Sequence, residues 1–325
     1  MKNIAIVCGG YSGEYEISIN SAETVSENLS KDLYHTYVIV IGQEDWYYEN
    51  EEGQKYLINR SDFTLVIEDK RISFDGIFNA IHGTPGEDGV LLAYFDLLGL
   101  PYTSSNMEIS ALTFNKYLCN KFVQSTGVAV AKSFSFVKGD EIDKKEVIEA
   151  LGLPLFIKPA KSGSSVGVSK VKTIKDFDLA VENAFKADDR LLIEEFLDGR
   201  EMACGLFPKN GKMVVLPITE IISKNDFFDY EAKYKSGMAT EVTPSENISE
   251  EIEMEIKATS SMLYHTLACR GVVRIDYMLT ESNLYFIEIN TIPGMSKASI
   301  IPQQIRAMGM GISELFEILV EDMFL

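Results

Sequence analysis

Hydrophobic residues in the first third of the chain follow two alternating patterns. Continuous apolar runs predict buried strands, and apolar residues three or four positions apart predict helices. The predicted strands lie at residues 4–7, 37–41 and 76–81, and the predicted helices contain residues 22–29 and 90–98. Strands that alternate with helices are typical of a parallel sheet covered by helices. We therefore predict an N-terminal parallel α/β domain over residues 1–103.

A second unit begins near Ser105. The tetrapeptide Ser105-Asn106-Met107-Glu108 has the pattern of a capping box and predicts a helical region that ends near Thr126. Further strands are predicted at 133–137, 154–158, 166–171 and 191–193, with helices at 144–151 and 174–186. Longer strands, a helix at 249–268, a hairpin and a closing helix follow Glu194. Because no linker separates these elements, we expect packed domains at residues 1–103, 104–193 and 194–325.

The amino-acid composition argues against nucleic-acid and membrane partners. The 325 residues include 30 Lys plus Arg against 49 Asp plus Glu, a net charge of -19, which would repel the nucleic-acid backbone over most of the surface. The four cysteines are far apart among apolar residues, which favours buried, reduced thiols. The N-terminal apolar run is too short for a signal peptide, and no run approaches membrane-spanning length. We expect a cytoplasmic protein without nucleic-acid or membrane partners.

The clearest chemical pattern lies in the predicted hairpin near the C-terminus. Because strand side chains alternate, Arg274 is expected to share a face with Asp276, and Phe286 is expected to share a face with Glu288 and Asn290. Two acids and an amide from adjacent strands can converge, and their oxygens suit Mg2+. The alternative is a row of solvent-facing residues, which the apolar neighbours of Glu288 and Asn290 make less favourable.

A second pattern is the segment "LFIKPAKSGSSVGV", residues 155–168. Lys158 at the end of an apolar strand, followed by a loop with Ser164 and Ser165, can present a cation and backbone donors to polyphosphate. A flexible hairpin loop with a surface lysine explains the pattern equally well, and the chain has no Walker A motif. The acids of "LLIEEFLDGRE", residues 191–201, are a weaker signal.

Two glycine loops follow strands of the first domain, "GGYSGE" and "HGTPGEDG". The dinucleotide-binding pattern G-x-G-x-x-G is incomplete because Cys8 occupies its first position. Acids after the second predicted strand keep a nucleotide site open at this stage. His82 alone is more often a structural histidine, but it follows a strand at the sheet edge where α/β proteins bind ligands. We therefore retain His82 as a candidate substrate-binding residue.

Seven segments together resemble the D-alanine–D-alanine ligases of the ATP-grasp superfamily. They are "GGYSGEYEIS", "HGTPGEDG", "IKPAKSGSSVGVSKV", "LIEEFLDGRE", "DYEAKY", "RIDYML" and "EINTIPGMSKASIIP". The resemblance runs nearly from end to end and implies a three-domain α+β ATP-grasp enzyme with an N-terminal parallel α/β domain. It implies that ATP lies between the central and C-terminal domains, and that the amino acids lie where all three domains meet.

The implied reaction joins two D-alanines for peptidoglycan synthesis. ATP phosphorylates the carboxylate of the first D-alanine, and the amine of the second attacks the resulting acyl phosphate. The resemblance implies ATP and Mg2+ as cofactors, with two ions per site and Mn2+ as a substitute, and it implies a homodimer. Two alternatives stay open, namely another ATP-grasp carboxylate–amine ligase and a nucleotide-binding regulator with a decayed active site.

The resemblance also implies roles for individual residues. The implied ATP contacts are Lys116, Lys158, Ser164, Ser165, Glu194, Glu195, Leu197, Glu201 and Lys233. Glu195 stands where many relatives have lysine, which leaves nucleotide preference open if the contact uses the side chain. The implied metal ligands are Asp276, Glu288 and Asn290, in agreement with the strand alternation. Arg274 and the backbone N–H of Gly294 match the pair that stabilises developing negative charge.

Substrate contacts and a lid are implied in the same way. Glu14 is expected to meet the ammonium group of the first D-alanine, and Ser299 and Ile300 match positions that contact the second. Residues 222–244 correspond to a loop that closes over the site and excludes water from the acyl phosphate. Within this loop Tyr234 is expected to hydrogen-bond with Glu14 and Ser164. Relatives that make a D-alanyl-D-lactate ester lack that tyrosine, so its presence favours the peptide product.

Overall fold

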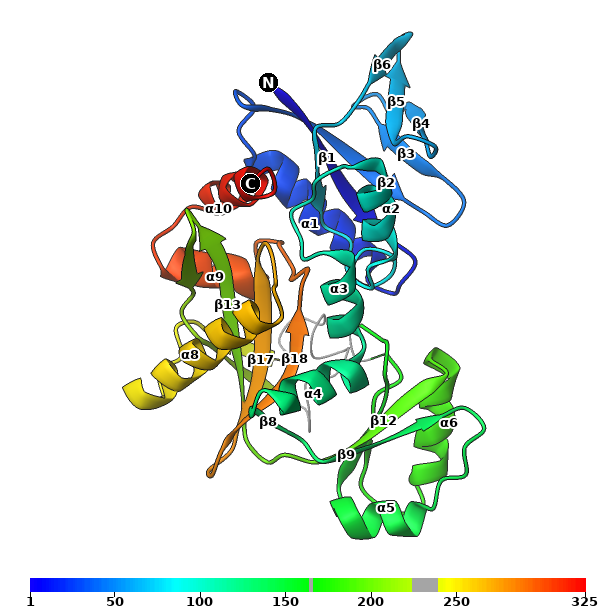
Figure 1. Cartoon of the computed structure of the whole chain (residues 1–325), viewed down its shortest axis with the longest axis vertical. Helices are drawn as coiled ribbons and strands as arrows, with labels where there is room; N and C mark the ends of the chain where they lie inside the picture. Colours follow the sequence, from blue (N-terminus) through cyan, green and yellow to red (C-terminus); the bar gives the residue numbers. More distant parts are fainter. Residues whose placement is uncertain (164–165, 224–238) are drawn as a thin grey trace.

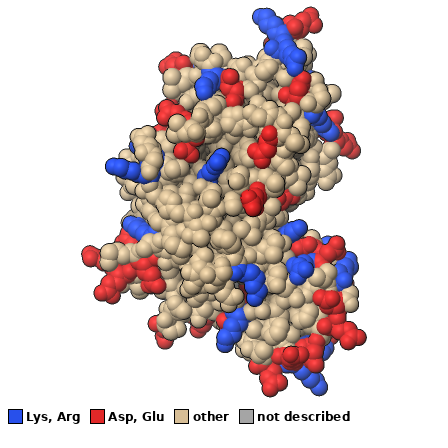
Figure 2. Space-filling model, viewed as in Figure 1, with Lys and Arg blue, Asp and Glu red and all other residues tan. Residues whose placement is uncertain are grey.

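The computed structural model describes residues 1–163, 166–223 and 239–325, and three sheets account for most of it. In the view of Figure 1 the N-terminal sheet lies at the top, a four-stranded sheet lies at the bottom, and the C-terminal sheet lies beside them in the middle. On the face shown in Figure 2, basic side chains are interspersed with acidic ones. No helix in these described ranges is long and apolar enough to cross a membrane.

The N-terminal sheet is parallel only at its centre. Strand β1 (Lys2–Gly9) pairs in parallel with β2 (Tyr34–Ile41) and with β7 (Gly76–Asn79), which confirms the predicted parallel arrangement of these strands. An antiparallel meander extends the sheet beyond β2. It consists of β3 (Trp46–Glu49), β4 (Lys55–Asn59), β5 (Thr64–Ile67) and β6 (Lys70–Ile72). The apolar pattern does not predict these four strands, because each has only three to five residues.

Strand β1 is buried on both faces. Its residues Ile4, Ile6 and Cys8 pack toward α1 (Tyr15–Asn28), while Ala5 and Val7 pack in a second core with α2 (Val90–Leu98). Burial on both faces explains why this strand reads as an unbroken apolar run. The parallel strands β1 and β7 also end at one edge of the sheet, so the two glycine loops that follow them meet there.

The four-stranded sheet is antiparallel, in the order β11-β10-β12-β9. Its strands are β9 (Ser133–Val137), β10 (Leu155–Pro159), β11 (Ser169–Val171) and β12 (Arg190–Glu195), and its helices are α5 (Lys144–Leu151) and α6 (Phe177–Ala187). Leu155 and Ile157 share a buried core with residues of both helices. Strand alternation therefore turns Lys158 and Glu194 to the opposite face of this sheet.

The C-terminal sheet has the order β16-β15-β13-β17-β18-β8, and β14 pairs with β13. Its strands are β8 (Ala129–Val130), β13 (Arg200–Lys209), β14 (Lys212–Val215), β15 (Thr219–Ser223), β16 (Ala239–Val242), β17 (Val273–Leu279) and β18 (Leu284–Asn290). Helix α8 (Glu250–Thr266) covers one face. The same core includes Cys119 and Val123, so helix α4 (Lys116–Ser125) packs on this sheet rather than on the four-stranded one.

The helical region predicted from Ser105 to Thr126 is two helices, α3 (Met107–Phe114) and α4. Asn115 interrupts it and caps α4 by accepting a hydrogen bond from the N–H of Leu118. The predicted capping box is wrong in detail, because Asn106 caps α3 while the Ser105 hydroxyl hydrogen-bonds to the backbone of Arg270. The side chain of Ser105 thus ties the start of α3 to the C-terminal sheet.

A β-bulge corrects the predicted faces of the hairpin. Asp276 pairs with Glu288, but the next residue, Tyr277, pairs with Phe286, so one residue of β18 is passed over. Phe286 and Tyr277 consequently lie in the apolar core, on the face opposite Glu288. The prediction that Phe286 shares a face with Glu288 is wrong, because simple alternation does not account for the extra residue of a bulge.

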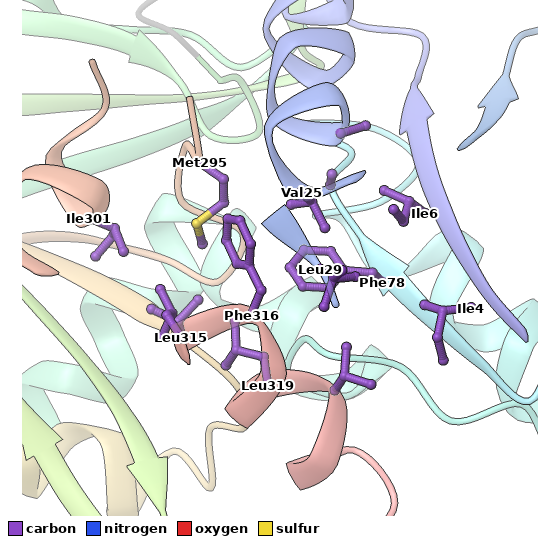
Figure 3. Packing of buried hydrophobic residues seen from close by; sticks show 14 of the residues in the cluster. Ile4, Ile6, Val25, Leu29, Phe78, Met295, Ile301, Leu315, Phe316 and Leu319 are labelled. Carbon is purple, nitrogen blue, oxygen red and sulfur yellow. The ribbon is translucent and has the colours of Figure 1, made fainter. Parts of the chain in front are cut away.

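The ends of the chain share one hydrophobic core (Figure 3). The predicted closing helix is two helices, α9 (Ile300–Ala307) and α10 (Ile312–Asp322). Leu315, Phe316 and Leu319 of α10 pack with Ile4 of β1 and with Phe78 of β7. The rings of Phe78 and Phe316 meet edge to face, with centroids 5.6 Å apart. This core fixes the N-terminal sheet against the C-terminal part of the chain.

Candidate active site

The buried centre of the site is an Arg–Asp pair on β17. Arg274 donates from Nε to Oδ1 of Asp276 at 2.8 Å and from a terminal nitrogen to Oδ2 at 2.6 Å. Asn290 of β18 donates to the same Oδ2 at 3.1 Å. Burial alone would lower the pKa of Arg274, but nearby carboxylates, with Asp276 the largest, raise it above its ordinary value. The guanidinium therefore stays charged, and both oxygens of Asp276 are held in place.

Glu288 lies beside this pair and binds a lysine from another element. Lys116, at the start of α4, lies 3.2 Å from Glu288 Oε2 and donates to the carbonyl oxygen of Ser162 at 3.1 Å. Burial would lower the pKa of Lys116, but Glu288, together with Glu87 and Glu194, raises it above its ordinary value. A protonated lysine next to the predicted metal ligands is well placed to approach a polyphosphate that bridges them.

A second lysine–carboxylate pair lies on the four-stranded sheet. Lys158 of β10 forms an ion pair with Oε2 of Glu194 on β12, and Asn120 of α4 donates to Oε1 of Glu194 at 2.9 Å. The next residue, Glu195, accepts a hydrogen bond from the N–H of Lys132 at 2.8 Å. Its carboxylate is therefore directed to the backbone of its own chain, consistent with a nucleotide contact that does not use this side chain.

Glu201 and Leu197 lie on and before strand β13. Glu201 pairs with Met278 across β13 and β17, and the same register pairs Ala203 with Asp276, so Glu201 lies on the same sheet face as Asp276. Leu197, in the connection between β12 and β13, is half-buried. Glu201 therefore lies on the sheet face that carries the Arg–Asp pair, and its charge is one of those that raise the pKa of Arg274.

The glycine loops surround the carboxylate of Glu14. This residue is buried immediately before α1. A Cβ atom added to Gly83 would lie 3.1 Å from Oε2 of Glu14, and a Cβ atom added to Gly163 would lie 3.0 Å from its carboxyl carbon. Two segments distant in sequence, at Gly83 and Gly163, thus approach this carboxylate closely, and at Gly163 the carboxylate leaves room only for glycine. Gly163 directly precedes the predicted serine loop, and the expected contact between Glu14 and Ser164 stays a prediction because Ser164 lies outside the described residues.

His82 is bonded on both sides of its ring. Nδ1 lies 2.8 Å from the carbonyl oxygen of Ile292, which can only accept, so Nδ1 carries the proton. Nε2 then accepts a hydrogen bond from the hydroxyl of Ser21, 3.0 Å away. Burial lowers the pKa of His82, against the opposing effect of Glu14. These bonds anchor the glycine loop to the segment after β18, so the structural role is clear, while substrate contact stays a prediction.

Gly294 and Ser299 lie in the turn before α9, and Ile300 is the first residue of that helix. A Cβ atom on Gly294 would come 2.7 Å from the hydroxyl oxygen of Ser299, which shows how closely the backbone passes. The Ser299 hydroxyl also lies 2.8 Å from that of Ser296. Ile300 is buried in a small cluster with Ala203, which pairs with Asp276 on the next strand. The turn and Ile300 therefore lie beside the Arg–Asp pair.

The sequence reasoning missed two polar residues of the site, the half-buried Glu87 and the buried Asn120. Glu87 accepts a hydrogen bond from the N–H of Gly83 at 3.0 Å, and burial, followed by the charge of Glu14, raises its pKa to about 8. The motif "HGTPGEDG" contains Glu87, so the signal was present in the glycine loop. Asn120 is the other, and its only signal is a position one helical turn after Lys116.

Some predicted residues lie outside the described residues: Ser164, Ser165, Lys233, Tyr234 and most of the loop 222–244.

The side chains predicted to bind the metal can be compared with the ligands that Mg2+ prefers. Across the described ranges no three His, Cys, Asp or Glu side chains gather as a metal site. Asp276, Glu288 and Asn290 offer two carboxylates and an amide on one face, which suits Mg2+ because that ion keeps water and phosphate oxygens as its other ligands.

Comparisons with known proteins cover the whole chain. The family models described as "D-ala D-ala ligase N-terminus" and "D-ala D-ala ligase C-terminus" match residues 3–105 and 122–321. The chain is 44% identical over 321 residues to the D-alanine–D-alanine ligase of Flavobacterium johnsoniae, covering 99% of both proteins. It is 43% identical over 324 residues to the ligase of the same name from Phocaeicola vulgatus, again covering 99% of both.

Solved structures give the same result. The D-alanyl-alanine synthetase A of Vibrio cholerae superposes with a TM-score of 0.90 at 28% identity, covering 100% of this chain and 99% of that one. The D-Ala:D-Ser ligase VanG of Enterococcus faecalis superposes with a TM-score of 0.88 at 32% identity, covering 99% of both chains. With family models over both halves and relatives matched from end to end, the chain belongs to the D-alanine–D-alanine ligase family.

Proposed function

We propose that the protein joins two D-alanines into D-alanyl-D-alanine at the expense of ATP, supplying a dipeptide for peptidoglycan. Family membership supports this activity. The observation that carries it to this chain is the convergence of unlike charges from three parts of the fold, because Lys116 is acted on by the charges of Glu288, Glu87 and Glu194, and Glu87 by that of Glu14. Lys158 comes from the four-stranded sheet, Arg274 and Asp276 come from the C-terminal sheet, and Glu14 comes from the N-terminal domain.

The two lysines are proposed to bind the phosphates of ATP. Lys116 and Lys158 are each held by a carboxylate, Glu288 and Glu194 respectively, so phosphate binding exchanges one anionic partner for another. The lysines therefore remain paired with an anion throughout the exchange. Mg2+ bound to Asp276, Glu288 and Asn290 supplies a Lewis acid for the phosphoryl oxygens.

Glu14 is proposed to bind the ammonium group of the first D-alanine. The carboxylate lies where the two glycine loops and residue 163 meet, so an amino acid held there is enclosed on several sides. Arg274 and the N–H of Gly294 then stabilise the negative charge that develops when the second amine attacks. Ser299 and Ile300, in the same turn and helix, are proposed to hold the second D-alanine.

Finer features belong to the same proposal. For the nucleotide, these are the adenine contacts of Glu194, Glu195 and Leu197, the ribose contact of Glu201, and two metal ions per site with Mn2+ as a substitute. For the loops, they are the lid 222–244 with Lys233 and Tyr234 and the serine loop with Ser164 and Ser165. The domain limits 103/104 and 193/194, a homodimer and a cytoplasmic location complete the proposal. They are supported by the resemblance of the motifs. The position of Glu14 against Gly163 supports the part that links the N-terminal domain to the serine loop.

A phosphate-release assay tests the activity. With ATP and Mg2+, we expect D-alanine to stimulate phosphate release and to yield the dipeptide, and we expect L-alanine, or D-lactate as acceptor, to give much less. Adding D-serine as acceptor separates a D-alanine–D-alanine ligase from a D-Ala:D-Ser ligase such as VanG. Phosphate release with a different amino acid alone would favour another ATP-grasp ligase. ATP binding without phosphate release for any amino acid would favour a decayed regulator.

A further inference from the structure

Asn120 is a buried amide that contacts the proposed nucleotide site from the side of α4. Its side chain is 6% exposed, and its Nδ2 donates to Oε1 of Glu194 at 2.9 Å. Its own oxygen, Oδ1, is buried without a hydrogen-bond partner among the described residues. A half-satisfied amide in an apolar helix face is costly. Asn120 is thus poorly explained as packing, and its bond to Glu194 is the interaction that accounts for it.

Two side chains donate to the carboxylate of Glu194, and in the proposed function only one of them keeps this bond when ATP is bound. Lys158 pairs with Oε2, and Asn120 bonds Oε1. In the proposed function Lys158 turns to the phosphates of ATP and leaves Oε2. Asn120 lies on a different element, in a helix packed on the C-terminal sheet, and does not take part in that exchange. Its bond is then what fixes the carboxylate of Glu194 while the nucleotide is bound.

The chemistry of a carboxylate makes this fixed position selective. An ionised carboxylate accepts hydrogen bonds and donates none. It can therefore accept from the 6-amino group of adenine, whereas the 6-oxo group of hypoxanthine or guanine offers only another acceptor. Sites built to bond a particular polar group discriminate strongly against analogues that lack it, provided that the site group cannot turn away. A hydrogen-bond donor that prevents the Glu194 carboxylate from turning therefore increases the preference for a nucleotide with a 6-amino group.

We propose that Asn120 is a positioning residue that holds Glu194 to select a 6-aminopurine over a 6-oxopurine nucleotide. The inference rests on the proposed function for the placement of adenine beside Glu194. It extends that function by assigning base selectivity to a residue outside the adenine segment itself.

The test compares ATP with inosine triphosphate, which differs in the group at position 6. In Asn120→Ala the KM for ATP should rise roughly tenfold, the loss expected for one hydrogen bond to a charged group, while kcat and the KM for D-alanine stay near wild type. The KM for inosine triphosphate should change little, so the preference for ATP falls. Asn120→Leu, which keeps the side-chain volume without the donor, should give the same result if the alanine variant is unstable.

Gln124→Ala is the matched control, because Gln124 is exposed one turn further along α4 and has no bond to Glu194 among those described. Its selectivity should equal that of wild type. An equal rise of KM for both nucleotides in the Asn120 variants, or no change for either, would overturn the proposal. Calorimetric binding of both nucleotides without D-alanine measures the same preference directly. The binding measurement tests the nucleotide preference even if D-alanine gives no turnover. Absence of turnover would count against the proposed function, and an unchanged nucleotide preference in the Asn120 variants would count against the role of Asn120.

Discussion

Replacing Gly163 with alanine should disable the enzyme through Glu14. The added Cβ would lie 3.0 Å from the carboxyl carbon of Glu14 and nearer still to Oε2. Since non-bonded carbon atoms prefer a separation of about 3.5–4.0 Å, the carboxylate or the chain at 163 must shift by roughly 0.5–1 Å. A misplacement of about 1 Å near reacting groups can cost on the order of 100-fold in rate. We therefore expect kcat/KM for D-alanine to fall roughly 10- to 100-fold.

The assay is phosphate release as a function of D-alanine concentration at saturating ATP and Mg2+. Gly13→Ala is the matched control, because a Cβ added there meets nothing within 4 Å and the residue belongs to the same glycine loop as Glu14. That variant should keep wild-type kinetics. If Gly163→Ala also retains wild-type kcat/KM for D-alanine while folding normally, the carboxylate of Glu14 does not serve the first substrate as proposed.

Three further predictions concern the charges of the site. Glu288→Gln removes an anionic ligand and should raise the Mg2+ concentration needed for half-maximal turnover at least tenfold; an unchanged Mg2+ titration would remove Glu288 from the metal site. Arg274→Lys replaces the two bonds to Asp276 with at most one and should lower kcat on the order of 100-fold, whereas wild-type kcat would exclude charge stabilisation by the guanidinium. Burial raises the pKa of Glu87 from 4.5 to about 8, so the folded chain holds a proton that the unfolded chain releases, and stability falls as pH rises through this interval. Glu87→Gln removes that loss, so its melting temperature relative to wild type should increase between about pH 5 and pH 8, and a constant difference would refute the shift.

The sequence predicts most of the elements that carry the site, because they follow strong patterns. The fully buried strand β1 is an unbroken apolar run, and the alternation on β17 correctly puts Arg274 and Asp276 on one face. The meander β3–β6 escapes prediction because its strands are short and exposed on one side. Phe286 is misplaced because a bulge adds one residue to β18, and nothing in the local sequence marks it.

Which residues of the site contact one another is harder to predict from the sequence than which residues belong to the site. Lys158 and Glu194 are 36 positions apart and meet because antiparallel pairing of β10 with β12 sets them diagonally on one face. Asn120 reaches Glu194 only because α4 packs on a different sheet from the one that carries Glu194. Such contacts depend on the packing of whole elements, and no spacing rule along the chain encodes them.

The core shared by the two ends of the chain has a consequence for synthesis on the ribosome. Ile4 and Ile6 of β1 are buried partly by Leu315, Phe316 and Leu319, which are made about 310 residues later than this strand. At about 5–20 residues per second, the first strand waits on the order of 15–60 s for this partner. During that time one face of the nascent N-terminal sheet is incompletely covered. A chaperone that protects apolar surface should therefore matter more for the yield of this protein in cells than for its refolding as a full chain.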